Sequence, residues 1–159
     1  MIVDVFSIAA GFVLRAVAGA LAVNVQISPW LYVVTLLGAL FLALSKRRHE
    51  LVLLQANAGS HRRILDEYSP ALLDQLILIV TASVVMAYSL YTFSAENLPR
   101  NQTMMLTIPF FLYGVFRYLY LVHQQNAGGA PEEIVLQDRP LILDIVLWVL
   151  ASVAILYTQ

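Results

Sequence analysis

The stretch AVAGALAVNVQISPWLYVVTLLGALFLALS, from Ala16 to Ser45, contains no Asp, Glu, Lys or Arg. The segment SKRRHEL, from Ser45 to Leu51, follows at once and carries three consecutive cations, a histidine and a carboxylate. Apolar runs of about 20 residues are needed to cross a bilayer as a helix. The sequence around this boundary therefore predicts a membrane protein whose polar chemistry collects at one membrane face.

The composition supports a membrane protein. Of 159 residues, 60% are hydrophobic and only 12% are charged, whereas a soluble domain carries about 25% charged residues. The absence of cysteine excludes disulfides, thiolate catalysis and Cys-ligated metals. No basic segment precedes the first apolar run, so a cleavable signal is not expected. Met1 begins almost inside a span, which suggests an internal start or a fragment of a longer protein.

Five apolar segments are predicted to be transmembrane helices, because an open sheet could not satisfy its backbone hydrogen bonds in lipid. We expect an all-α membrane protein with one transmembrane domain over residues 1–159 and no soluble domain. The expected spans are residues 5–23, 29–45, 73–93, 103–121 and 141–158.

The distribution of cations orients these spans. Cytoplasmic loops of membrane proteins carry an excess of Lys and Arg. The connections on one face of the membrane contain only Arg100. The connections on the other face contain or adjoin seven cations: Lys46, Arg47, Arg48, Arg62, Arg63, Arg117 and Arg139. Both long loops and the N-terminus are therefore expected in the cytoplasm, with the C-terminus outside.

Arg15 lies well inside the first span, where a charge is costly and marks a candidate functional site. Helical projection places it on one stripe with Asp4 and with small residues that favour close helix packing. We therefore expect Arg15 to point into the bundle. It would either bind carbonyls or a carboxylate of another helix, or contact a bound phosphate. Asp4 is three turns away, about 16 Å by helix rise, and is not expected to be its partner.

The first charged cluster would share a helix face if the second span continues past Ser45. Lys46, Arg47 and Glu50 then lie together, while Arg48 points to the opposite side. A Lys46–Glu50 ion pair, or a plain positive-inside signal, would explain these residues without a function. Cations for phosphate oxygens and a carboxylate for a divalent metal within one turn favour a binding site.

A second cluster precedes the third span. Arg62 and Arg63 are spaced i,i+4 from Asp66 and Glu67, as on an amphipathic surface helix, so these residues and Tyr68 are either a solvated face or part of a site. Ser69 and Pro70 are predicted to begin the next helix. The aromatic fourth span and His123 at its end are expected to be interfacial, or to line a groove for an isoprenoid chain.

Four segments carry a family resemblance. DVFSIAAGFVLRAVAGA, residues 4–20, resembles the opening helix of the second half of UbiA-type membrane transferases. SKRRHEL (45–51), HRRILDEYS (61–69) and GGAPEEIVLQDRPL (128–141) resemble the decaprenyl-phosphate phosphoribosyltransferase branch. The resemblance covers essentially the whole chain. It implies the last five helices of a nine-helix bundle whose active site opens on the cytoplasmic side of a bacterial plasma membrane.

This resemblance implies transfer of 5-phosphoribose from phosphoribosyl diphosphate to a polyprenyl phosphate, with Mg²⁺, for arabinan precursors of the cell envelope. Its phosphate-binding residues here would be Lys46, Arg47, Arg48, Arg62, Tyr68 and Arg15, with Glu50 as a metal ligand, and no catalytic residue is assigned. The expected partners are the membrane, these two substrates and a missing N-terminal half. A nucleic-acid partner is not expected, and a homo-oligomer is left open.

The first motif of the UbiA family, N-D-x-x-D-x-x-x-D, is absent from the sequence. It supplies the main Mg²⁺-diphosphate ligands of the family, so the chain is expected to be inactive alone. A prenyltransferase with a prenyl diphosphate donor is one alternative function. A non-enzymatic membrane subunit or scaffold is another.

Overall fold

A computed structural model describes residues 2–24, 26–56, 69–94, 98, 100–124 and 131–158. Every element in these ranges is helical, which confirms the predicted fold class. Five helices are long and apolar enough to cross a membrane. The elements are α1 (Ile2–Ala22), α2 (Pro29–Ala56), α4 (Pro70–Ser94), the 3₁₀ helix η1 (Thr103–Thr107), α5 (Ile108–Gln124), α6 (Pro131–Gln137) and α7 (Arg139–Tyr157).

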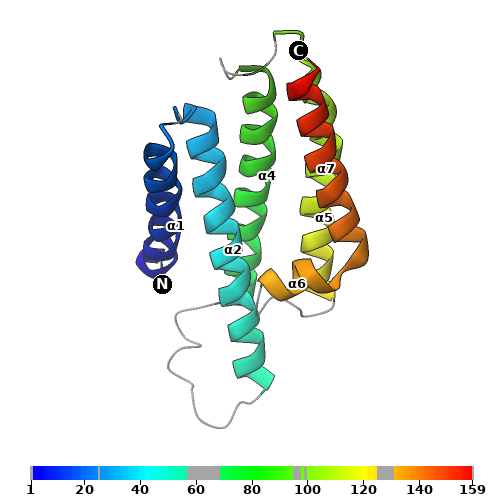
Figure 1. Cartoon of the computed structure of the whole chain (residues 1–159). Helices are drawn as coiled ribbons and strands as arrows, with labels where there is room; N and C mark the ends of the chain where they lie inside the picture. The colour runs from blue at the N-terminus through cyan, green and yellow to red at the C-terminus, as the bar shows by residue number, and fades with distance from the viewer. Residues whose placement is uncertain are drawn as a thin grey trace.

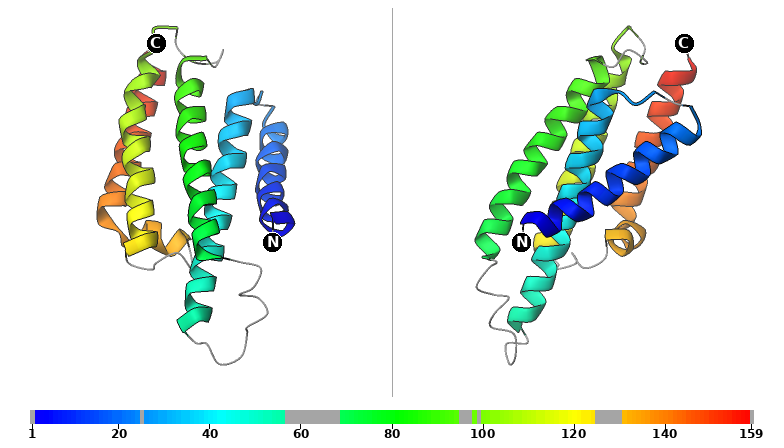
Figure 2. Two further views of the ribbon diagram at one scale, coloured as in Figure 1. Left: turned by 180° about the vertical axis from the view of Figure 1, so that it is seen from behind. Right: turned by 90° about the vertical axis from the view of Figure 1, so that its left-hand side faces the viewer.

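The helices pack side by side, with α2 between α1 and α4 and with α5 against α7 (Figure 1). Two further views show that α1 crosses α2 obliquely and that the far end of α2 projects beyond the other helices (Figure 2). The two chain ends lie at opposite ends of the bundle, as an odd number of spans requires. Helix α6 lies at the end where the chain begins, beside the start of α7 (Figure 1).

Helix α2 is 28 residues long and continues eleven residues past Ser45, where the predicted span ended. The segment after Ser45 is rich in Lys, Arg, Glu and Leu, which are good helix formers. The condition for Lys46, Arg47 and Glu50 to share a helix is therefore met. The extension begins with the charged and polar residues 46–50 and continues into the apolar residues 51–54.

A polar cluster ties three elements together near the end of the bundle where the chain finishes. The Tyr88 hydroxyl on α4 lies 2.7 Å from the Thr107 hydroxyl of η1. The Trp148 indole N–H of α7 donates to the same Tyr88 oxygen at 2.8 Å. The Tyr88 ring stacks on Phe111 of α5, with ring centroids 4.1 Å apart. A buried hydroxyl that is fully paired in this way fixes how the helices fit together.

The predicted helix boundaries agree with the structure at most ends. Helix α4 begins at Pro70, as the Ser69-Pro70 pair predicted. Helix α7 begins at Arg139, and the Asp138 side chain caps it by accepting from the Leu141 N–H at 3.0 Å. Helix α6 was not predicted, and it begins with a proline, Pro131. Proline suits the first turn of a helix as well, since its missing N–H has no partner there in any case.

Candidate functional site

The cations at the end of the predicted second span turn to two sides of α2. Arg47 binds two carboxylates: Nη1 donates to Glu50 at 2.6 Å, and Nη2 lies 2.5 Å from Asp4 of α1. Arg48 binds Asp74 of α4, and the same Asp74 oxygen lies 3.3 Å from His123 Nε2 of α5. Arg47 therefore joins α2 to α1, whereas Arg48 joins α2 to α4 and α5.

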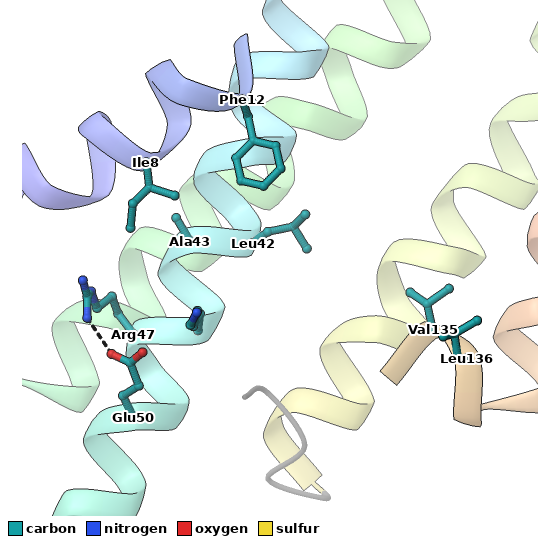
Figure 3. Close-up of a pocket in the computed structure, with 9 residues that line it drawn as sticks. Ile8, Phe12, Leu42, Ala43, Arg47, Glu50, Val135 and Leu136 are labelled. Atoms are coloured by element: carbon teal, nitrogen blue, oxygen red, sulfur yellow. Dashed lines mark hydrogen bonds and ion pairs between the residues drawn. The ribbon is translucent and has the colours of Figure 1, made fainter. Parts of the chain in front are cut away.

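A cleft of about 740 Å³ opens on the Arg47 side of α2. Ile8 and Phe12 of α1 lie above it, and Val135 and Leu136 of α6 face them from across the opening (Figure 3). The remaining lining residues all come from α2: Leu42, Ala43, Lys46, Arg47 and Glu50. The cleft lies in the size range of small-molecule sites. Its α2 wall is apolar inside the bundle and charged where α2 emerges.

Two donors in this cleft are unused within the described part of the chain. The Lys46 ammonium lines the cleft and has no ion-pair partner there. The Arg47 Nε–H is buried and has no hydrogen-bond acceptor. A buried donor without an acceptor is unfavourable. The Lys46 ammonium is therefore available to the oxygens of an anionic ligand, whereas the Arg47 Nε–H is enclosed by protein atoms.

Apart from Arg15, the predicted site residues separate into three groups. Lys46, Arg47 and Glu50 are brought together at the cleft, but as an Arg47–Glu50 pair rather than the Lys46–Glu50 pair considered as an alternative. Arg48 lies on the other side of α2, as its position on the helix predicted, and does not line the cleft. Arg62 and Tyr68 lie outside the described residues.

The expectation that Arg15 points into the bundle is wrong for the described part of the chain. Arg15 is exposed, and its guanidinium lies 5.9 Å from the centroid of the Phe12 ring. The buried face of α1 consists instead of Val5, Ala9 and Val13. A helical projection shows which residues share one face of a helix. It does not show which face packs against the neighbouring helix. Asp4 is not the partner of Arg15, as expected, because it binds Arg47.

Glu50 alone does not make a metal site. Within the described ranges no group of three His, Asp or Glu side chains is placed to hold a metal ion. Mg²⁺ is commonly held by one or two carboxylates together with substrate phosphates and water. Glu50 fits such a role as a single ligand, with the other ligands supplied by the substrate and by residues beyond those described.

Asp4, Ile8, Phe12, Val135 and Leu136 also line or brace the cleft and were not predicted as site residues. Asp4 could have been suspected, because a lone carboxylate at the start of an apolar helix needs a partner. Val135 and Leu136 carried no comparable signal, since two apolar residues after an acidic pair fit many roles.

The wall formed by α6 is held in place by an ion pair at its junction with α7. Arg117 of α5 binds both oxygens of Asp138, through Nε at 3.0 Å and Nη2 at 2.8 Å. Hydrogen bonding from Arg117, assisted by the Leu141 N–H, lowers the pKa of Asp138 below its ordinary value of 3.8. One carboxylate therefore caps α7 and fixes the end of α6 to α5.

This lowered pKa predicts a stability change in acid. The folded carboxylate is favoured, so its contribution is complete above 3.8 and is lost as the pH falls through the lower folded pKa. The melting temperature in micelles, followed by circular dichroism, should drop further between about pH 6 and about pH 3 in the wild type than in Asp138→Asn. Asn keeps the helix cap but cannot ionise. Equal acid sensitivity of the two proteins would contradict the role given to the Arg117–Asp138 pair.

Comparisons with known proteins agree with the family resemblance. No family model matches the chain. It is 30% identical over 158 residues to the decaprenyl-phosphate phosphoribosyltransferase of Corynebacterium glutamicum, covering 98% of this chain and 47% of that protein. It is 29% identical to the enzyme of the same name from Mycolicibacterium smegmatis and 28% identical to that of Mycobacterium tuberculosis. Each of these two matches covers 93% of this chain, and 49% and 48% of the relatives.

These matches extend over nearly the whole chain but over only part of each relative. The share covered is consistent with the predicted C-terminal half of such a protein. The chain is thus a relative of the decaprenyl-phosphate phosphoribosyltransferases and spans about half of their length.

Proposed function

We propose that this chain forms one side of a membrane phosphoribosyltransferase of the UbiA type, active on the cytoplasmic face of a bacterial plasma membrane. The substrates would be phosphoribosyl diphosphate and a polyprenyl phosphate, and the product would feed arabinan precursor synthesis for the envelope. The observation that carries the proposal is the cleft beside α2, because cationic groups stand at its rim and apolar side chains form its inner wall. An anionic head and a lipid tail need such a combination.

The proposed reaction needs cations more than it needs a base. An oxygen of the polyprenyl phosphate bonds to the anomeric carbon while the bond from that carbon to diphosphate breaks. Negative charge grows on the leaving diphosphate, and cations aimed at its oxygens stabilise the transition state more than the ground state. Lys46 would fill this role, with the Arg47 guanidinium group beside it. The acceptor phosphate is already anionic near neutral pH.

The small amount of positive charge at the rim of the cleft is the reason that we propose a partner segment. Asp4 and Glu50 neutralise the side chain of Arg47, and Lys46 is left as the cation without a counterion at the cleft. This is little charge for a diphosphate group. Mg²⁺, which would supply charge when bound, could use Glu50 as one ligand. Further cations and metal ligands would come from the half of the protein that this chain does not match.

The function can be tested by supplying that half. The chain is co-expressed with the part of the Corynebacterium glutamicum relative that it does not match, and separate membrane samples receive labelled phosphoribosyl diphosphate or labelled prenyl diphosphate. We expect label in the polyprenyl lipid with both parts present and none with the chain alone. Label entering only from prenyl diphosphate would instead support the prenyltransferase alternative.

Two other outcomes of this experiment would also count against the proposal. An assembled pair of segments that transfers neither label would favour a scaffold role. Transfer of phosphoribose by the 159-residue chain alone would show that the missing half is not required.

A further inference from the structure

A carboxylate lies inside the last membrane span, away from the Lys46 cleft. Asp144 is the sixth residue of α7, about 9 Å along the helix from the capping Asp138. It is only 8% exposed. No hydrogen bond or ion pair to it is found among the described residues. Ionisable side chains in membrane spans are costly and usually mark a site, and neither the proposed reaction nor the relatives' name assigns one here.

Asp144 borders a second cavity, of about 270 Å³, between α2, α5, α6 and α7. Five of the ten other lining residues are aromatic. Phe41 comes from α2, Phe110, Phe111 and Tyr118 from α5, and Trp148 from α7. This cavity is smaller than the Lys46 cleft, and its charged group has the opposite sign.

Helix α5 leaves space for the carboxyl group of Asp144. A Cβ atom added to Gly114 would lie 2.9 Å from Asp144 Oδ2, which is closer than carbon and oxygen atoms can pack. Glycine at this position is therefore what allows the carboxylate to stand against α5 at the edge of the cavity. A side chain at this position would require the Asp144 carboxyl group to shift.

The chemistry of this pocket selects the ligand. A carboxylate repels phosphate and attracts a cation or a hydrogen-bond donor. Aromatic ring faces attract organic cations as well, most strongly where water is excluded. Asp144 belongs to a helix that is long and apolar enough to cross a membrane. We propose that the Asp144 pocket binds an alkylammonium group, either the headgroup of an amine lipid or a free amine.

Trp148 provides a direct probe of binding. It is one of two tryptophans, so Trp30→Phe leaves it as the sole indole. The chain is placed in nanodiscs of phosphatidylglycerol and titrated with tetramethylammonium or ethanolamine, with KCl at equal ionic strength as a control. We expect a saturable change of Trp148 emission with the amines and none with KCl. Replacing part of the lipid by phosphatidylethanolamine should produce the same change without added amine if the source is a lipid.

Variants distinguish the pocket from general cation attraction. Asp144→Asn should weaken amine binding at least about tenfold, and Gly114→Ala should weaken it by crowding the carboxyl group. Glu133→Gln removes the same charge from the exposed surface of α6, outside the pocket, and should bind as the wild type does. Circular dichroism verifies that each variant is folded. The proposal would be overturned if KCl reproduced the emission change or if Asp144→Asn retained it. It would also be overturned if neither the amines nor the amine lipid changed the emission.

Discussion

Replacing Arg47 by Ala is expected to lower both the stability of the chain and the affinity of the assembled protein for diphosphate. Arg47 is 31% exposed and holds Asp4 of α1 and Glu50 of α2. Removing one partner of a buried ion pair costs about 3–5 kcal/mol, and exposed pairs contribute about 0–1 kcal/mol. For this partly exposed network we expect a loss of about 1–3 kcal/mol.

The effect on binding has a separate cause. A hydrogen bond between charged groups contributes about 1.5–3 kcal/mol. Its loss should raise the Kd for inorganic diphosphate by about 10- to 150-fold. Stability is measured by thermal unfolding of the chain, and affinity by calorimetry on the two-part protein with Mg²⁺ present.

Two further variants make this result specific. Arg47→Lys keeps the charge but cannot bind both carboxylates, and should fall between the wild type and Arg47→Ala. Arg100→Ala removes one cation from an exposed turn outside the cleft and should change neither quantity. If Arg47→Ala unfolds more easily but the two-part protein binds diphosphate normally, Arg47 serves only to join α1 to α2.

Replacing Lys46 by Ala should affect binding without affecting stability. Lys46 is exposed, lines the cleft and has no ion-pair partner in the described part of the chain. Among the described residues, none loses an ion-pair partner when Lys46 is removed. The Kd of the two-part protein for inorganic diphosphate should still rise by about 10-fold or more, because a charge-assisted contact is lost.

The matched comparison for Lys46 is Arg48, one residue further along α2. In the described part of the chain, Arg48→Ala leaves Asp74 with His123 as its one remaining partner, so it should destabilise the chain and leave diphosphate affinity nearly unchanged. The two variants are thus expected to have opposite profiles. Unchanged affinity in Lys46→Ala would remove the main support for placing the donor phosphates at this rim.

Most of the fold could be predicted from the sequence, because the bilayer imposes strong rules on composition. Uncharged runs and the Ser69-Pro70 pair indicated the spans and the start of α4. The length of α2 beyond Ser45 was harder to predict, since hydropathy marks the membrane boundary and not the end of the helix. Helix α6 has seven residues, too few for a periodic pattern to be recognised.

The site could be predicted only in part. Spacing along one helix predicted that Lys46, Arg47 and Glu50 lie together, because this depends on helix geometry alone. Contacts between helices were beyond that reasoning. The Asp4–Arg47 ion pair and the exposure of Arg15 depend on which face of α1 meets α2. Asp144 escaped notice because it is a single carboxylate within a long apolar run.

The junction of α6 and α7 limits which insertions and deletions the chain can accept there. Asp138 alone separates the two helices, and Val135 of α6 lines both cavities. One extra residue between them would turn α6 by about 100° relative to α7. Val135 would then leave both cavities, and Asp138 could not reach Arg117 and the α7 N–H at once. Substitutions of similar shape can be accommodated at this corner, but a one-residue insertion or deletion cannot.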